Sequence, residues 1–345
     1  YCSPGMHLLS SIISKSVDIN AYDYAKKMLF GPLGITHSFW PSDPNGITFG
    51  WGDLRLLPKD MAKIGFLYLH KGIWDGKRIL PEKFLEAATM PQTRTGHNDD
   101  YGYGWWISPN PDKQFGYVFS AEGRGGQQIK VVPKANAVVV MVGSGIDKYL
   151  GPIDDILGKS LISTKTALSE NPQAFAKLSE RVAGARQAPL KQNINKASTR
   201  KKHKNNKLPK MAKLISGKIF QLDINSLGLK NIRFDFVLDQ RTDSKESESN
   251  VQLTLNDGST LSQLIGMDGV PLFSNTGKFN SPVALSGVWQ TNDTFLLELD
   301  EISGINFFKF LFHFEGKPVG SKVRVQVKER TGVVGDDLVI NGKMK

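Results

Sequence analysis

The sequence has almost no cysteine and no long apolar run. Cys2 is the only cysteine among 345 residues, which excludes an internal disulfide and a metal site built from several thiolates. No apolar run reaches the roughly 18 residues that a transmembrane helix needs, so no membrane span is predicted. The chain begins with Tyr1 instead of methionine, so the lack of a leader peptide says nothing about export.

Several common catalytic and binding motifs are missing as well. The sequence contains no His-Glu-x-x-His zinc motif, no Gly-x-Ser-x-Gly nucleophile elbow, no dinucleotide-binding glycine motif and no P-loop. The six histidines do not show the spacing of metal ligands, and we interpret them as surface or packing residues. The sequence therefore shows neither a metal-ligand motif nor a nucleotide-binding motif.

The positive charge is concentrated in one segment. The chain carries a net charge of +11, and ten Lys and Arg without any Asp or Glu lie between Arg186 and Lys213. This segment is too poor in apolar side chains to offset the entropy lost on ordering, so we interpret 186–213 as a flexible linker. Contact with nucleic acid or anionic lipid is the less favoured alternative, because no aromatic side chains interleave the charges. No specific nucleic-acid partner is expected.

The first half of the chain changes from helices to strands. Apolar spacing predicts two helices within residues 4–30, and Pro58 and Pro81 stand where two further helices begin. Short strands follow after Tyr101, ending with Ala137 to Val142, a continuous apolar run that we expect to be buried on both faces. Helices followed by an antiparallel sheet predict an α+β domain over residues 1–165.

The second half is predicted to be all-β. A helix and the basic linker occupy 166–213, and after them short strands recur at regular spacing with turns such as Asn256-Asp257-Gly258 between them. This pattern predicts an up-and-down, lipocalin-like barrel over residues 214–345. The predicted strands are 215–224, 232–238, 251–255, 284–289, 295–299, 307–314, 323–327 and 338–340.

Two stretches are candidates for chemistry. Tyr1-Cys2-Ser3 places an aromatic hydroxyl and small residues before an apolar helix that we expect to be buried. Ser120 to Gln127 lies between two predicted strands and is rich in glycine, which lets a ligand or another backbone approach closely. Tyr1 on its own would be interpreted as a frayed terminal residue.

Five motifs, in the same order, resemble those of β-lactamase-related serine hydrolases. This group contains class C β-lactamases, penicillin-binding-protein-like proteins, esterases and 6-aminohexanoate-dimer hydrolase-like proteins. The motifs are Tyr1-Cys2-Ser3, Phe30-Gly31-Pro32-Leu33-Gly34-Ile35, Gly50-Trp51-Gly52 with Pro58 to Gly65, Tyr101-Gly102-Tyr103-Gly104-Trp105, and Ala121-x-Gly123-x-Gly125-Gly126-Gln127. The resemblance covers residues 1–145 and implies the C-terminal part of a β-lactamase/transpeptidase-like domain.

The resemblance implies acyl transfer through a serine ester, a chemistry that needs neither metal nor nucleotide, so no cofactor is expected. A Ser-x-x-Lys motif supplies the nucleophile in this group, and a tyrosine moves protons between nucleophile and leaving group. By resemblance, Tyr1 is this tyrosine and Ser3 its hydrogen-bonding companion, while Trp51 and Trp105 are expected in the pocket wall. The strand expected to bind substrate and the oxyanion carries Glu122, Gly123, Arg124 and Gly125.

The nucleophile motif is not where the resemblance requires it. Ser198-Thr199-Arg200-Lys201 is the one Ser-x-x-Lys in the sequence, and it follows the tyrosine inside the basic linker. We therefore predict an N-terminally truncated hydrolase that is inactive alone, although its longer parent hydrolyses a small ester, amide or β-lactam. Ser3 in place of Asn and the missing Lys-Thr-Gly favour an esterase or amidase over a β-lactamase.

The expected setting and the alternative function rest on the same resemblance. Relatives are usually exported, so a periplasmic or extracellular location and a small-molecule substrate are expected. The alternative is a binding module in which the C-terminal barrel recognises a ligand or cell-wall material.

Overall fold

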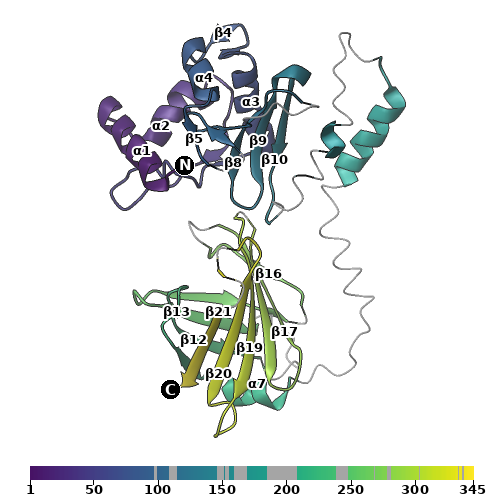
Figure 1. Cartoon of the computed structure of the whole chain (residues 1–345). Helices are drawn as coiled ribbons and strands as arrows, with labels where there is room; N and C mark the ends of the chain where they lie inside the picture. Colours follow the sequence, from purple (N-terminus) through teal and green to yellow (C-terminus); the bar gives the residue numbers. More distant parts are fainter. Residues whose placement is uncertain are drawn as a thin grey trace. The chain divides into compact units, whose positions relative to one another are not determined.

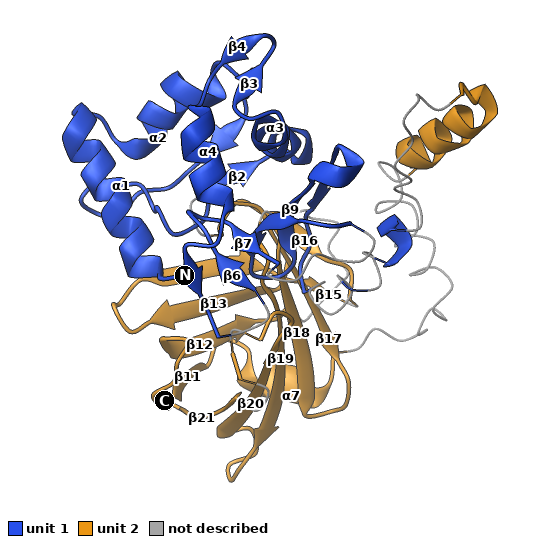
Figure 2. Cartoon of the chain, turned by 45° about the horizontal axis from the view of Figure 1, so that its top comes forward, with its two compact units in different colours: residues 1–165 blue, residues 166–345 orange. Residues whose placement is uncertain are grey.

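The structure, a computed structural model, describes two compact units, Tyr1–Lys165 and Thr166–Lys345 (Figure 1 and Figure 2, blue and orange). The predicted fold is confirmed, because the first unit combines helices with an antiparallel sheet and the second contains a nearly closed barrel. No described helix is both long and apolar enough to cross a membrane. The description covers residues 1–345 except 97–98, 109–114, 146–150, 152–154, 159–168, 185–207, 238–247, 268, 278–280, 303, 333 and 336–337.

Helices make up most of the first half of unit 1. Asn20 caps α2, because its side chain accepts a 2.8 Å hydrogen bond from the backbone N–H of Asp23. Pro58 occupies the first turn of α3, where a missing N–H costs nothing. The helices are α1 (Ser3–Val17), α2 (Ala21–Ala25), a π-helix (Lys26–Phe30), α3 (Pro58–Leu69) and α4 (Glu82–Thr89).

Helix α1 turns its apolar side chains to the solvent, so the expectation that it is buried is wrong for the described chain. Leu8, Leu9 and Ile12 are 61%, 52% and 52% exposed. The opposite side contacts α2 and the loop at Gly50. Apolar periodicity predicts which face of a helix is suited to packing, but not which segment packs against it.

Six strands of unit 1 form one antiparallel sheet in the order β10-β9-β8-β7-β6-β5. The edge strand β10 is half-buried along its length, so the expectation that it is buried on both faces is wrong. Two further strand pairs, β1 with β2 and β3 with β4, lie outside this sheet. The strands are β1 (Ser38–Phe39), β2 (Arg55–Leu56), β3 (Ile73–Trp74), β4 (Lys77–Arg78), β5 (Thr93–Arg94), β6 (Asp100–Tyr101), β7 (Trp106–Ile107), β8 (Phe119–Gly123), β9 (Gln127–Val132) and β10 (Ala137–Met141).

One face of this sheet forms the core beneath α3. Ile107, Phe119 and Val131 stand opposite one another on β7, β8 and β9, and all three are buried. Helix α3 crosses β9 and β10 (Figure 1), and its Gly65 lets the backbones come close. A Cβ at Gly65 would lie 2.5 Å from a methyl group of Val138. The neighbouring positions on these strands therefore point to the other face.

Unit 2 contains one curved sheet of eleven strands. Its order is β14-β13-β12-β11-β21-β20-β19-β18-β17-β15, with β16 also paired to β17. The strands are β11 (Ile219–Leu222), β12 (Leu229–Asp235), β13 (Asn250–Leu255), β14 (Thr260–Leu264), β15 (Gly266–Met267), β16 (Leu272–Ser274), β17 (Val283–Trp289), β18 (Thr294–Glu301), β19 (Phe307–Glu315), β20 (Lys322–Glu329) and β21 (Leu338–Met344).

A single stretch of chain nearly closes this sheet into a barrel. Strand β14 pairs antiparallel with β13 at one edge, and β15, which follows after Ile265, pairs in parallel with β17 at the other edge. Gly266 permits the tight return that follows, because a Cβ there would lie 1.6 Å from the carbonyl oxygen of Val270. The predicted barrel is thus confirmed as a nearly closed one.

A short helix, α7 (Lys210–Ile215), belongs to the barrel core. Met211 and Ile215 are 7% and 0% exposed and pack in the core formed by the barrel strands. The flexible linker was predicted to extend to residue 213, but its last residues belong to α7. They are ordered because Met211 and Ala212 bury apolar surface in the barrel core. The linker residues 185–207 lie outside the described residues, whereas 172–184 are helical as expected for the start of this segment.

Candidate functional site

Tyr1 is joined to the Trp51 loop by a short hydrogen bond. Its phenolic hydroxyl donates to the carbonyl oxygen of Trp51 at 2.5 Å. Ser3, the expected companion of Tyr1, begins α1 and is exposed. The first and third sequence motifs are therefore brought together.

The loop that receives this bond is held by the ring of Trp40 and by Gly50. The indole Nε1–H of Trp40 donates to the carbonyl oxygens of Phe49 and Gly52 at 2.7 and 2.9 Å. Gly50 lies against α1, since a Cβ there would be 2.2 Å from the carbonyl oxygen of Met6. The Trp51 ring stacks on Phe49 at 5.3 Å and is 39% exposed, which suits its predicted place in a pocket wall.

The ring of Tyr1 also meets the fourth sequence motif. Tyr101 on β6 lies edge-on to Tyr1 with ring centroids 6.5 Å apart, and Trp106 on β7 lies edge-on to Tyr101 at 4.9 Å. Tyr101 and Trp106 stand directly opposite each other in the strand register. Sequence reasoning did not choose these two as site residues. The sequence signal that could have identified them is the strand pattern, because if Ile107 points into the core, its neighbour Trp106 points to the opposite face.

Trp105 does not share this face. It is 4% exposed, and its ring packs at 4.5 Å from Tyr68 and 5.1 Å from Phe119 in the core beneath α3. Trp105 was predicted to lie in the pocket wall, and this prediction is wrong because its side chain belongs to the core. Neighbouring strand residues point to opposite faces, so the tryptophan that faces Tyr101 is Trp106.

Ser120 and Glu122 on β8 lie on the same face as Tyr101. Trp106 stands opposite Ser120 in the register, and Glu122 follows Ser120 by two positions. The Ser120 hydroxyl and the Gln128 amide donate to one carboxylate oxygen of Glu122, at 2.7 and 2.9 Å. Two strand spacings, or about 10 Å, separate Tyr101 from Ser120 across the sheet.

The predicted oxyanion residues form the end of β8 and the turn that follows. Gly123 ends β8, while Arg124 and Gly125 lie in the turn to β9, where the Gly126 N–H donates to the Gly123 carbonyl at 3.3 Å. Gly125 and Gly126 are buried and have φ angles of 84° and 91°, which residues other than glycine rarely adopt. The Arg124 side chain is exposed.

Burial and neighbouring charges shift two pKa values near this face. Burial, with a smaller contribution from the Tyr1 phenol, raises the pKa of Tyr101. Burial also raises the pKa of Asp99, helped by the negative charges of Glu122 and Asp100 and opposed by Lys130. The face thus holds two phenols and several carboxyl groups, all of which can donate or accept protons.

No metal centre is found among the described residues. No group of three or more His, Cys, Asp or Glu gathers there, and Cys2 is exposed. Of the described histidines, His7 contacts Asp43 at 3.2 Å and His70 lies 4.0 Å from the ring of Phe66.

Comparison with known proteins connects the chain to the predicted group. It is 23% identical over 158 residues to a 6-aminohexanoate-dimer hydrolase of Paenarthrobacter ureafaciens, covering 43% of this chain and 39% of that protein. The chain thus spans about two fifths of the length of this curated relative. No protein-family profile matches it. The resemblance to β-lactamase-related serine hydrolases that the motifs predicted is confirmed by this relative.

Two solved structures are similar to part of the chain. One, described as a 6-aminohexanoate-dimer hydrolase of Bacillus anthracis, has 21% identity and a TM-score of 0.41, covering 48% of this chain and 45% of that one. The other, a penicillin-binding protein of Bacillus halodurans, has 17% identity and a TM-score of 0.36, covering 45% and 55%.

Proposed function

We propose that unit 1 is the tyrosine-bearing part of a serine hydrolase that cleaves a small ester or amide through an acyl-enzyme. The observation that supports this most directly is the meeting of three separate motifs around Tyr1. Trp51 accepts its hydrogen bond, Tyr101 lies against its ring, and Trp106 extends the same face. Tyr1 is 59% exposed, so its hydroxyl is accessible to a substrate.

In this proposal Tyr1 transfers the proton between nucleophile and leaving group. A phenol within hydrogen-bond reach of both can act as general acid and then as general base. The glycine-rich turn after β8 offers backbone N–H groups to a developing oxyanion, with Glu122, Gly123, Arg124 and Gly125 around it. Trp51 and Trp106 would form the apolar wall. No metal or other cofactor is required for these steps.

The nucleophile is proposed to come from a segment outside these 345 residues. The one Ser-x-x-Lys, Ser198 to Lys201, lies outside the described residues and in the basic segment. The exposed Leu8, Leu9 and Ile12 beside Tyr1 offer a surface for such a segment, and the curated relative is much longer than the part matched here. The chain alone would then be inactive, whereas the longer protein would be an exported hydrolase.

The substrate class is proposed from the same residues. The curated relative is named for hydrolysis of a 6-aminohexanoate dimer, and a linear amide fits an open face lined by tryptophans. The missing Lys-Thr-Gly and Ser3 in place of Asn weigh against efficient β-lactam turnover.

Covalent labelling of two proteins tests this function. One is the 345-residue chain, and the other is the longer product translated with the codons upstream of Tyr1. We expect a fluorophosphonate probe to label the longer protein, and this protein to hydrolyse p-nitrophenyl esters and the 6-aminohexanoate dimer. The 345-residue chain should do neither. Labelling of the chain alone would contradict the external nucleophile, and a folded but inert longer protein would contradict the hydrolase.

A further inference from the structure

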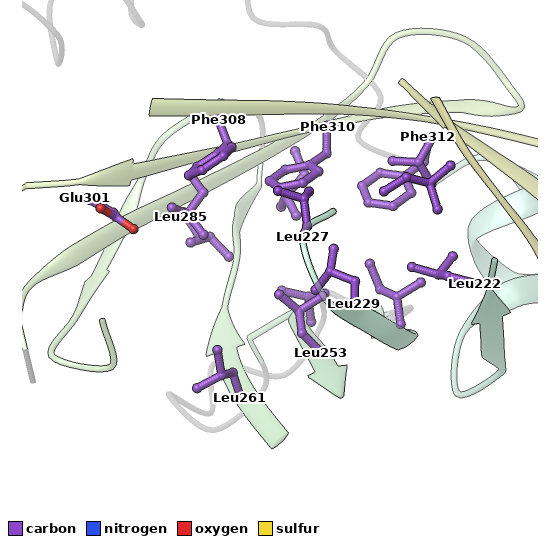
Figure 3. A pocket seen from close by; sticks show the side chains of 16 residues that line it. Leu222, Leu227, Leu229, Leu253, Leu261, Leu285, Glu301, Phe308, Phe310 and Phe312 are labelled. Carbon is purple, nitrogen blue, oxygen red and sulfur yellow. The ribbon is translucent and has the colours of Figure 1, made fainter. Parts of the chain in front are cut away.

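The barrel of unit 2 encloses an apolar cavity of about 250 Å³ (Figure 3). Among the described residues, those that line it are all Leu, Ile, Val or Phe except Glu301. Protein interiors normally contain few voids larger than a water molecule, and an engineered apolar cavity of about 150 Å³ is enough to bind benzene. Water would find few partners here, because each buried water needs about two to four polar groups. The cavity therefore suits an apolar ligand.

One end of the barrel is filled by aromatic rings. The ring of Trp289 lies 5.1 Å from Phe295 and 5.9 Å from Phe314, and Phe234 lies 5.5 Å from Phe295. Helix α7 packs in the same core through Met211. A ligand can therefore extend only to the depth at which this cluster begins.

The other end of the cavity reaches the solvent. Leu285, Leu299 and Phe308 stand opposite one another on β17, β18 and β19; Leu285 is buried, but Leu299 and Phe308 are half-buried. Leu261 on β14 also lines the cavity and is 39% exposed. This strand forms the seam where the barrel closes, so an elongated ligand can enter there with one end left near water.

Glu301 is the one polar residue in the described part of the lining and lies at this open end. Alternate residues of β18 face inward, and Glu301 is the next inward position after Leu297 and Leu299. Figure 3 shows Glu301 at the end of the labelled lining, beyond Leu285 and Phe308. Its Oε2 accepts a 2.7 Å hydrogen bond from the Nδ2 of Asn306, which fixes the carboxylate at the end of the strand. No lysine or arginine is among the described residues that line the cavity. The mouth thus favours a head group that donates hydrogen bonds or carries positive charge.

We propose that the barrel binds a single linear alkyl chain whose amine or hydroxyl head group lies at Glu301. The chain would fill the Leu and Phe lining, because burial of apolar surface drives its transfer from water. A carboxylate head would meet the like charge of Glu301, with no lining cation to neutralise it. The site lies wholly within unit 2 and does not depend on the hydrolase proposed for unit 1.

Titration calorimetry of the full chain tests the site and its head-group preference. The probes are dodecylamine, dodecanol and dodecanoate, each kept below its micelle concentration at neutral pH. We expect the amine and the alcohol to bind at one site per chain, with the carboxylate weaker by about tenfold or more, equivalent to about 1.4 kcal/mol. Absence of binding by both amine and alcohol, or preference for the carboxylate, would overturn the proposal.

Matched substitutions on β18 locate the ligand. Leu299→Trp places bulk in the cavity, whereas Leu296→Trp places the same bulk on the outer side of the same strand. The first should weaken amine binding about tenfold or more and the second should change it little. Equal effects of the two would contradict binding inside the barrel, provided that circular dichroism shows both variants folded.

Glu301→Gln tests the head-group contact, with Glu298→Gln as its control. Glu298 lies on the outer side of β18, where it pairs with Lys309 at 2.7 Å. We expect Glu301→Gln to reduce the preference for amine over carboxylate, since the amide carries no charge. Glu298→Gln should leave that preference unchanged. An unchanged preference in Glu301→Gln would exclude Glu301 as the head-group contact.

Discussion

The phenolic hydroxyl of Tyr1 donates a 2.5 Å hydrogen bond to the carbonyl oxygen of Trp51, fifty residues further along the chain. Tyr1 is separated from α1 only by Cys2, the N-cap residue, and the Trp51 loop lies against the same helix through Gly50. The position of the proposed proton-transferring tyrosine is therefore set by a tertiary contact between the helix and the loop.

Gly50 should be essential for this contact. In Gly50→Ala the new Cβ would lie 2.2 Å from the Met6 carbonyl oxygen and 2.9 Å from the Cβ of Ser10, so the loop must move away from α1. We expect a loss of about 1–3 kcal/mol in the free energy of unfolding, measured by urea denaturation. Gly52→Ala is the control, because no atom lies within 4 Å of its added Cβ. Equal stabilities of the two variants would contradict the close packing of Gly50.

Removal of the Tyr1 hydroxyl should reduce catalysis in the longer protein. General acid–base catalysis contributes about a hundred- to ten-thousand-fold, so Tyr1→Phe should lower kcat by a factor in this range. The measurement is steady-state ester hydrolysis across pH. Tyr103→Phe is the control, since Tyr103 is 52% exposed and stacks on Phe84 at 6.4 Å, away from the Tyr1 cluster. If Tyr1→Phe retained full kcat, Tyr1 would have no catalytic role.

Helix α7 should contribute to the stability of the barrel. Met211→Ala removes a side chain that is 7% exposed, and truncation of a buried methionine costs about 2–5 kcal/mol. Leu214→Ala changes the same helix at a side chain that is 50% exposed and should stay within about 0.5 kcal/mol. Hydrogen exchange of peptides from β19 and β20 measures both effects. Similar protection in the two variants would show that α7 is not part of the core.

Asp293 and Asp300 should give the barrel opposite responses to pH. Burial raises the pKa of Asp300 above its ordinary 3.8, so the folded state holds a proton that the unfolded state has lost. The stability contributed by Asp300 therefore falls as the pH rises from about 3.8 through the folded pKa. Asp300→Asn, which cannot ionise, should remove this fall and be more stable than wild type at neutral pH.

The stability contributed by Asp293 changes with pH in the opposite direction. Hydrogen bonds from Thr291 and Thr294 hold the pKa of Asp293 below 3.8, so its stabilisation is present above that pH and is lost as the pH falls through the folded pKa. Asp293→Asn should be less stable than wild type at neutral pH and should match it in strong acid. Hydrogen exchange of β18 between pH 3 and pH 7 measures both variants. Changes of the same sign would contradict this assignment.

Much of the architecture could be predicted because it depends on local pattern. Alternating apolar residues marked β18 to β20, and Pro58 marked the start of α3. Strands β14 to β16 were not predicted, since the stretch 260–274 is interrupted by Gly266, Gly269 and Pro271 and has no clear alternation. Their pairing depends on the two sheet edges that they join, which no local pattern records.

The sequence by itself determined the two fold classes, the order of the hydrolase-like motifs and the residue types of the proposed site. The fold classes follow from periodicity and spacing, which are properties of neighbouring residues. The motifs and site residues follow from the resemblance of short local stretches to those of the hydrolase group. Only the tertiary structure decided that Trp106 and not Trp105 faces Tyr101, that the apolar side of α1 meets solvent, and that the barrel keeps an open apolar cavity. Each of these depends on which distant segments pack together, and side-chain pattern alone leaves that choice undetermined.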